Sequence, residues 1–135
     1  MNCENISMQI TSNSELVSII RLTVSGIANK MGFSIEDIDD IKVCISEACT
    51  NAIKHSKDTK FKVDFNIFSN KLEIKVKDDG IGYDYNSLKN PDFNGLKESG
   101  MGIFIIKSLM DEVSIESENK QGTTINMTKY LGVDS

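Results

Sequence analysis

Hydrophobic and polar residues alternate in five segments of this chain, and each of these segments is predicted to be a strand. The segments are 4–11, 61–68, 71–77, 112–117 and 123–130. A repeat of two residues is typical of strands that bury one face. Ser69 and Asn70 suit a two-residue turn, which predicts a hairpin between the second and third segments. Residues 120–122 are expected to connect a second hairpin in the same way.

Three other segments repeat apolar residues every three or four positions, which predicts helices. These helices are expected at 14–31, 34–55 and 100–110. Ser14, followed by an acidic residue, can start the first, and Gly32 is expected to stop it. Ser34 can cap the second helix, which is expected to run to about His55.

The order of the elements is strand, two helices, two strands, a loop, one helix and two strands. This order predicts one α+β domain over residues 1–135, a two-layer α/β sandwich. Its sheet is expected to be mixed but mostly antiparallel, with helices on one face. The loop at 78–99 is long for a compact domain, and loops of this kind are commonly functional lids.

Composition narrows the classes of function. The chain has 135 residues, a net charge of -5 and a single arginine, which argues against nucleic acid as a direct partner because phosphate backbones are held by clusters of Lys and Arg. No window reaches the eighteen or so apolar residues of a membrane span, and the N-terminus lacks the pattern of a signal peptide. A cytoplasmic protein that binds a protein or a small molecule is expected.

Cysteine and histidine exclude several kinds of site. The three cysteines, Cys3, Cys44 and Cys49, lack CxxC spacing, so inert thiols are expected rather than a disulfide or a zinc site. His55 is the only histidine, which excludes a multi-histidine metal site and any Ser-His-Asp triad with a base other than His55. His55 itself is interpreted either as a polar residue at a helix end or as a phosphate contact.

Glu47 and Asn51 are the first candidate site residues. They lie four positions apart on the second predicted helix, so their side chains project from nearly the same face, one turn apart. This pairs a proton acceptor with an amide oxygen that suits Mg²⁺. Both positions fall beside the apolar stripe of the helix, at the border of the core, where a ligand pocket can form.

Two glycine-containing segments complete the candidate site. Asp78 ends a predicted strand and is followed by Gly80 and Gly82, which allow the backbone to turn tightly. Gly100 and Gly102 are expected to open the third helix, where free N–H groups attract phosphate. The sequence has no GxxxxGK[ST] motif and no GxGxxG motif after its first predicted strand, so the common nucleotide-binding folds are disfavoured.

These segments, together with Gly122-Thr123, follow the order of the boxes of the GHKL family of ATP-binding domains, which the chain resembles. Longer stretches make the resemblance more specific. IIRLTVSGIANKMG, IKVCISEACTNAIKH, LMDEV and MTKYL are similar to the anti-sigma factor serine kinases of the RsbW type, with the SpoIIAB type more distant. The resemblance implies the Bergerat fold of GHKL domains.

The resemblance also implies roles for the site residues. Glu47 would be the catalytic base and Asn51 would bind the Mg²⁺ that accompanies ATP. Asp78 would read adenine, because a carboxylate only accepts hydrogen bonds and adenine offers its amine, and Thr123 would complete that pocket. The backbone at Gly80, Gly82, Gly100, Met101 and Gly102 would contact the nucleotide, with the Met101 side chain expected to pack.

The function implied is a partner switch. A family member of this type sequesters a sigma-B-type sigma factor and phosphorylates a small anti-sigma factor antagonist on serine or threonine, and it acts as a homodimer. Arg21, on the polar face of the first helix, is interpreted as a partner contact or as a solvated residue. Glu98 stands where SpoIIAB-type members carry an arginine, so a cationic contribution from that position is not implied here.

Two alternatives remain. One is the ATP-binding part of a two-component histidine kinase. It is disfavoured because the only histidine, His55, lies on the same predicted helix as Glu47 and Asn51, and no separate helix carries a phosphoacceptor histidine. The other is a module that binds nucleotide without transferring phosphate. The presence of both Glu47 and Asn51 argues against it.

Overall fold

The computed structural model describes residues 3–55, 60–78, 94–118 and 122–132. Its elements follow the predicted order. They are β1 (Glu4–Thr11), the short 3₁₀ helix η1 (Ser14–Leu16), α1 (Val17–Met31), α2 (Ile35–His55), β2 (Lys60–Ile67), β3 (Lys71–Asp78), α3 (Asn94–Leu109), β4 (Glu112–Glu118) and β5 (Gly122–Tyr130).

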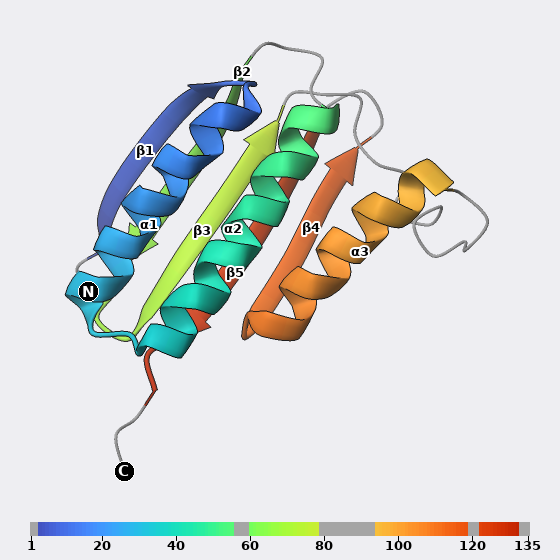
Figure 1. Ribbon diagram of the computed structural model, residues 1–135. Coiled ribbons are helices and arrows are strands. Elements are labelled where there is room, and N and C mark those ends of the chain that lie inside the picture. Colours follow the sequence, from blue (N-terminus) through green and yellow to red (C-terminus); the bar gives the residue numbers. More distant parts are fainter. Residues whose placement is uncertain (1–2, 56–59, 79–93, 119–121, 133–135) are drawn as a thin grey trace.

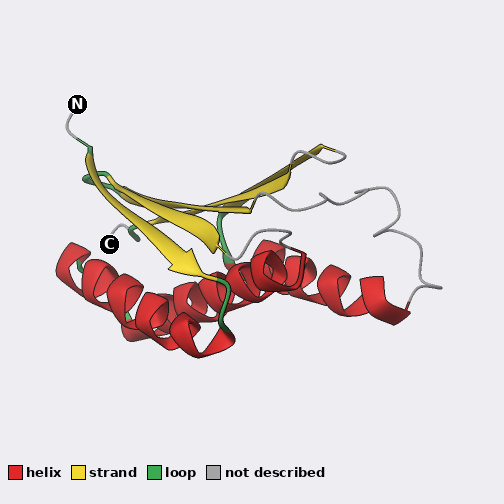
Figure 2. Cartoon of the chain, turned by 90° about the horizontal axis from the view of Figure 1, so that it is seen from above, coloured by secondary structure: helices red, strands yellow, loops and turns green. Residues whose placement is uncertain are grey.

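The strands form one sheet in the order β1-β2-β3-β5-β4. Each neighbouring pair in this order is antiparallel, so the sheet is more uniform than the mixed sheet predicted from the sequence. The helices cover one face of the sheet, as the view along the two layers shows (Figure 2). The predicted α+β class and the two-layer sandwich are therefore confirmed.

The alternation along the strands determines which face is buried. In β3 the side chains of Leu72, Ile74 and Val76 are buried, while the residues between them are exposed or half-buried. The Phe68 N–H donates to the Lys71 carbonyl at 3.0 Å, which closes the predicted two-residue turn between β2 and β3.

The first helix ends as predicted but starts differently. Gly32 follows α1 with a φ of 97°, a left-handed conformation that glycine adopts without a steric penalty. At the other end, the Asn13 side chain accepts a hydrogen bond from the Glu15 N–H at 2.9 Å. The prediction that Ser14 starts the helix is therefore corrected: Asn13 caps the 3₁₀ turn that precedes α1.

The second helix begins as predicted. The Ser34 hydroxyl accepts a hydrogen bond from the Asp37 N–H at 3.1 Å, which satisfies one of the free amides of the first turn. One face of α2 is buried against the sheet and the neighbouring helices, as its apolar stripe predicts. The buried side chains of this face are Ile41, Cys44, Ile45, Ala48, Cys49 and Ala52.

The third helix is longer than predicted. It begins at Asn94, not at Gly100, so Gly100 and Gly102 lie inside the helix instead of opening it. Leu96, Lys97 and Glu98 are good helix formers and can extend the helix across two glycines. Residues 79–93 of the predicted lid lie outside the described residues.

The elements run so that the segments with the candidate site residues meet at one end of the sheet. The C-terminal part of α2, the end of β3, the start of β5 and the first turns of α3 all lie at the upper end in Figure 1. The core fills the space between the two layers, with Ile20 and Val24 of α1 on one side and Phe65 of β2 on the other. In the described part of the chain, no helix combines the length and apolar character that a membrane span requires.

Candidate active site

Glu47 and Asn51 face the third helix across a very short gap. A Cβ atom added to Gly102 would lie 2.9 Å from Glu47 Oε2 and 3.6 Å from Asn51 Nδ2. Glu47 is half-buried and Asn51 is only 3% exposed. The helix pairing predicted for Glu47 and Asn51 is therefore real, and Gly102 is the residue that allows α3 to approach both side chains.

The Asn51 amide is an unusual buried group. Its Nδ2 atom has no hydrogen-bond partner among the described residues and is shielded from solvent. Leaving such a donor unsatisfied costs about 1–3 kcal/mol. A polar ligand beside Gly102 would supply the missing acceptor.

Asp78 and Thr123 are brought together by the sheet. They are directly opposed on β3 and β5, and their side chains are 3% and 1% exposed. Both side chains point to the helix-covered face of the sheet, because each continues the buried alternation of its strand. The Thr123 hydroxyl lies 3.1 Å from the Ser117 hydroxyl of β4. A carboxylate and a hydroxyl therefore meet at the edge of the core.

The structure describes only some of the other predicted nucleotide contacts. Gly80 and Gly82 lie outside the described residues. Gly100 is described only as part of α3, and Met101 is 58% exposed, so the expectation that the Met101 side chain packs is wrong. Met101 points outward because Gly102, Ile103 and Ile106 occupy the inner face of α3.

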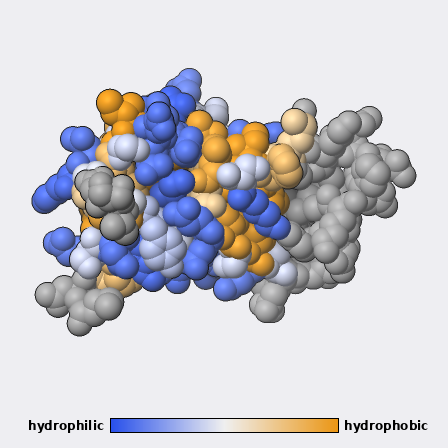
Figure 3. Space-filling view, turned by 90° about the horizontal axis from the view of Figure 1, so that it is seen from below, coloured by the Kyte–Doolittle hydropathy of each residue, from blue (hydrophilic) through white to orange (hydrophobic). Residues whose placement is uncertain are grey.

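Arg21 lines a groove that also contains Glu47. The groove, of about 700 Å³, runs between α1 and α2. Its walls are formed by Ser18, Arg21, Leu22, Asp39, Lys42, Val43, Ser46 and Glu47. Two of its apolar residues, Leu22 and Val43, are 72% and 44% exposed. Further hydrophobic side chains gather in the middle of the lower surface, next to hydrophilic ones (Figure 3).

The thiols agree with their predicted inert character at two positions. Cys44 and Cys49 are free and buried. Burial, joined at Cys44 by the nearby Asp40 carboxylate, raises the pKa of each thiol to about 12. Cys3 is free and exposed. The His55 side chain is outside what the structure describes. Within the described ranges, no three His, Cys, Asp or Glu side chains are grouped as a metal site would require.

Lys129 is not among the predicted site residues, although its amine is buried between α2, α3 and β5. Two segments of the family resemblance contain this part of the molecule: Lys129 lies in MTKYL, and Asp111, which bonds to the backbone beside it, lies in LMDEV.

Residues 10–129 match the family model of the histidine kinase-like ATPase domain. The chain belongs to this family. Serine-protein kinase RsbW of Bacillus thuringiensis is 41% identical to it, with 95% of this chain and 86% of that protein covered. Serine-protein kinase RsbW of Bacillus anthracis is 40% identical over the same shares. The resemblance inferred from the sequence is thereby confirmed.

Solved structures agree on the fold. A structure of the RsbU and RsbW domains of a Mycobacterium tuberculosis protein superposes with a TM-score of 0.73 at 19% identity. It covers 98% of this chain, which spans only 34% of that longer protein. The SiaB-SiaC complex of Pseudomonas aeruginosa gives a TM-score of 0.64 at 9% identity, with 93% of this chain and 88% of that chain covered.

Proposed function

We propose that this protein is an ATP-dependent serine/threonine kinase that also acts as an anti-sigma factor. Its substrate would be a small anti-sigma factor antagonist, and its other partner would be a sigma-B-type sigma factor. The observation that carries the proposal is the contact of Gly102 with Glu47 and Asn51. In this arrangement a carboxylate and a buried amide lie against a glycine of α3. They are at the same end of the sheet as the opposed pair Asp78 and Thr123.

The adenine end of the site would be formed by the sheet. Asp78 would accept a hydrogen bond from the exocyclic amine of adenine, and the Thr123 hydroxyl would contribute a second polar contact. A guanine base presents a carbonyl oxygen at that position, so it would leave two acceptors facing each other. The nearly complete burial of Asp78 makes such a mismatch costly.

The phosphate end would be formed by the helices. Asn51 fits a magnesium site, because this ion takes only one or two protein oxygens and keeps phosphate oxygens and waters as its other ligands. Mg²⁺, when bound, would neutralise charge on the phosphates. The unsatisfied Nδ2 atom of Asn51 supports a polar ligand at this place.

Glu47 would take part in the transfer step itself. The oxygen of the substrate hydroxyl would form a bond to the γ-phosphorus while the bond from that phosphorus to the β–γ bridging oxygen breaks. Glu47 would accept the hydroxyl proton, and ADP would leave with the bridging oxygen. The open groove that Glu47 shares with Arg21 gives a protein substrate a way to reach the carboxylate.

The glycine segments are proposed nucleotide contacts with one condition. In α3 as described, the amides of Gly100, Met101 and Gly102 lie inside the helix, where N–H groups are normally bonded to the preceding turn. Contact with phosphate would therefore require α3 to begin near Gly100 in the nucleotide-bound protein. Gly80 and Gly82 would shape the backbone after Asp78.

The groove between α1 and α2 is the proposed partner surface. Arg21 and Lys42 supply positive charge, and the exposed Leu22 and Val43 supply apolar area. Mixed apolar and charged surfaces with an arginine are typical of protein interfaces. We further propose that residues 1–135 act as one domain in the cytoplasm and as a homodimer.

The test is incubation with γ-labelled ATP, Mg²⁺ and three candidate proteins in parallel: a small antagonist, a sigma factor and a response regulator. Label on a serine or threonine of the antagonist, together with a stable complex with the sigma factor, is the expected result. Label on a response regulator would overturn the proposal in favour of histidine-kinase chemistry. Binding of ATP without label on any protein would favour the non-catalytic module.

A further inference from the structure

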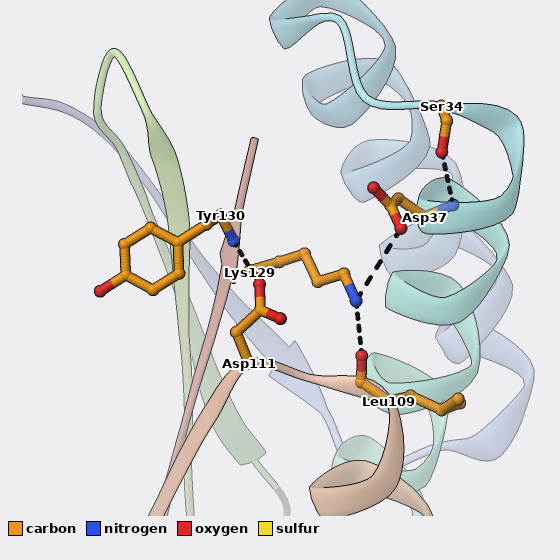
Figure 4. A network of polar contacts seen from close by, with 6 residues as sticks. All are labelled: Ser34, Asp37, Leu109, Asp111, Lys129 and Tyr130. Carbon is orange, nitrogen blue, oxygen red and sulfur yellow. Dashed lines mark hydrogen bonds and ion pairs between the residues drawn. The ribbon is translucent and has the colours of Figure 1, made fainter. Parts of the chain in front are cut away.

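A buried lysine joins three elements at the end of the molecule opposite the candidate site. Lys129, the next-to-last residue of β5, is only 9% exposed. Its Nζ donates a hydrogen bond to the Leu109 carbonyl at 2.6 Å and lies 3.9 Å from an oxygen of Asp37. Figure 4 shows the amine between α2 and the end of α3.

Both contacts of Lys129 are at helix ends. Leu109 is the last residue of α3, and the carbonyls of the last turn have no partner within the helix. A cation there also meets the negative end of the helix dipole. Asp37 lies in the first turn of α2. One ammonium group therefore links the end of α3, the start of α2 and strand β5.

The backbone that carries Lys129 is fixed by Asp111. The Asp111 N–H donates to the Thr128 carbonyl at 3.0 Å, and its carboxylate accepts from the Tyr130 N–H at 2.7 Å. These bonds hold the residues on both sides of Lys129 to the turn that follows α3. Figure 4 shows the bond to Tyr130. The long lysine side chain thus starts from a fixed point, which makes its bond to α3 more specific.

The position of α3 matters because of Gly102. Helix α3 packs mainly on α2 and makes few contacts with the sheet. Leu109 lies seven positions after Gly102, a span of about 10 Å along a helix. A tilt or slide at the Leu109 end would move Gly102 away from Glu47 and Asn51 or into them.

We propose that Lys129 is a positioning residue that holds the end of α3 to β5 and so sets the distance of Gly102 from Glu47 and Asn51. The inference rests on the proposed function for its effect on phosphotransfer. Its structural part, the fixing of α3, concerns the protein without nucleotide.

The first test is kinetic and uses K129M, which keeps the length of the side chain but removes the ammonium. We expect kcat for phosphotransfer to fall by about 10-fold or more, because a small misplacement of catalytic groups is costly. The KM for ATP should change by less than about threefold, since Asp78 and Thr123 lie on the sheet. K129R should recover most of kcat, because a guanidinium group can also donate to the Leu109 carbonyl.

The matched control is K75M, which makes the same replacement in an exposed lysine of β3. K75M should leave kcat unchanged. A second control, D37N, removes the longer contact and keeps the bond to Leu109, so its effect should be small. If K129M lowers the melting temperature but keeps the kcat of wild type at a temperature where both are folded, the positioning role is wrong.

The second test is hydrogen exchange of the protein without nucleotide. In K129M the amides of residues 103–109 should exchange about 10-fold faster or more than in wild type, while those of α1 keep their rates. Equal exchange in α3 would overturn the inference. Because this readout needs no ATP, it separates the two proposals: absent phosphotransfer in wild type would refute the proposed function and leave the exchange result to decide on Lys129.

Discussion

Glu47 is the residue at which binding and chemistry can be separated. Glu47→Gln keeps the side-chain volume that faces Gly102 but removes the proton acceptor. We expect phosphotransfer to fall by about 100-fold or more, as for loss of a general base, and ATP affinity to change by less than about threefold. Rapid-quench kinetics and calorimetry measure the two quantities. The control is Glu36→Gln, which makes the same change at an exposed position of the same helix. Loss of ATP binding in Glu47→Gln would instead make Glu47 a structural residue.

Asp78 is expected to decide the choice of base. Asp78→Asn replaces one acceptor oxygen with a donor at a buried position, and the lost charge-assisted hydrogen bond is worth about 1.5–3 kcal/mol. Affinity for ATP should therefore fall by about 10- to 150-fold in calorimetry. The control is Asp64→Asn, which makes the same change on β2, on the face of the sheet opposite to the core. Asp64 bonds with Ser7 there, so the change should leave ATP affinity unchanged. An unchanged affinity in Asp78→Asn would remove Asp78 from the pocket.

At the scale of elements, the contact between α2 and α3 separates stability from activity. Gly102→Ala should favour α3 by about 1 kcal/mol, since alanine is the better helix former, but its Cβ would lie 2.9 Å from Glu47 Oε2. The Glu47 carboxylate can move away from the new methyl group, because it is at the end of a flexible side chain. We expect the melting temperature to be kept and kcat to fall by about 10-fold or more.

Gly26 offers a matched control for this experiment. It lies inside α1, and a Cβ added there meets no atom within 4 Å. Gly26→Ala should therefore stabilise the protein by about 0.5–1 kcal/mol and leave kcat as in wild type. If Gly102→Ala behaves like Gly26→Ala in both measurements, the approach of α3 to Glu47 has no role in the chemistry.

A structural feature could be predicted from the sequence when it depends on residues that are close together along the chain. The pairing of Glu47 with Asn51 was predictable, because it depends on helix geometry within one turn. The opposition of Asp78 and Thr123 was implied only by the family resemblance, because it depends on the register between strands that are far apart in the sequence, which hydrophobic periodicity does not give. The start of α3 was placed too late because two glycines were read as a helix beginning, although the preceding residues favour a helix.

At the scale of the molecule, the sheet connects the two ends on which the proposals depend. Thr123 is the second residue of β5, at the end near the candidate site, and Lys129 is the next-to-last residue at the other end. Helix α3 runs between the same two ends, with Gly102 in its middle and Leu109 at its end near Lys129 (Figure 1). The proposed adenine end is thus built on the sheet, whereas the proposed phosphate end depends on how two helices are held to it. A change at the lysine end can therefore alter chemistry and spare base recognition.

The buried thiol of Cys44 makes the stability of the whole molecule sensitive to alkaline pH. Burial, and then the Asp40 carboxylate, raise the pKa of Cys44 from 9.0 to about 12. Above pH 9 the unfolded chain loses this proton while the folded protein keeps it, so the free energy of unfolding falls as pH rises toward 12. Between pH 8 and pH 10.5 this group alone should remove about 2 kcal/mol.

Urea unfolding at both pH values tests this expectation. Cys44→Ala should lose less stability over the interval than wild type, by about 2 kcal/mol, whatever the variant loses at pH 8 through the smaller side chain. Cys3→Ala is the control, because the same replacement at an exposed position should leave the full decrease in place. Equal decreases in the three proteins would mean that the folded protein opens enough for Cys44 to ionise, and α2 would then be less firmly packed beside Glu47 than its buried face indicates.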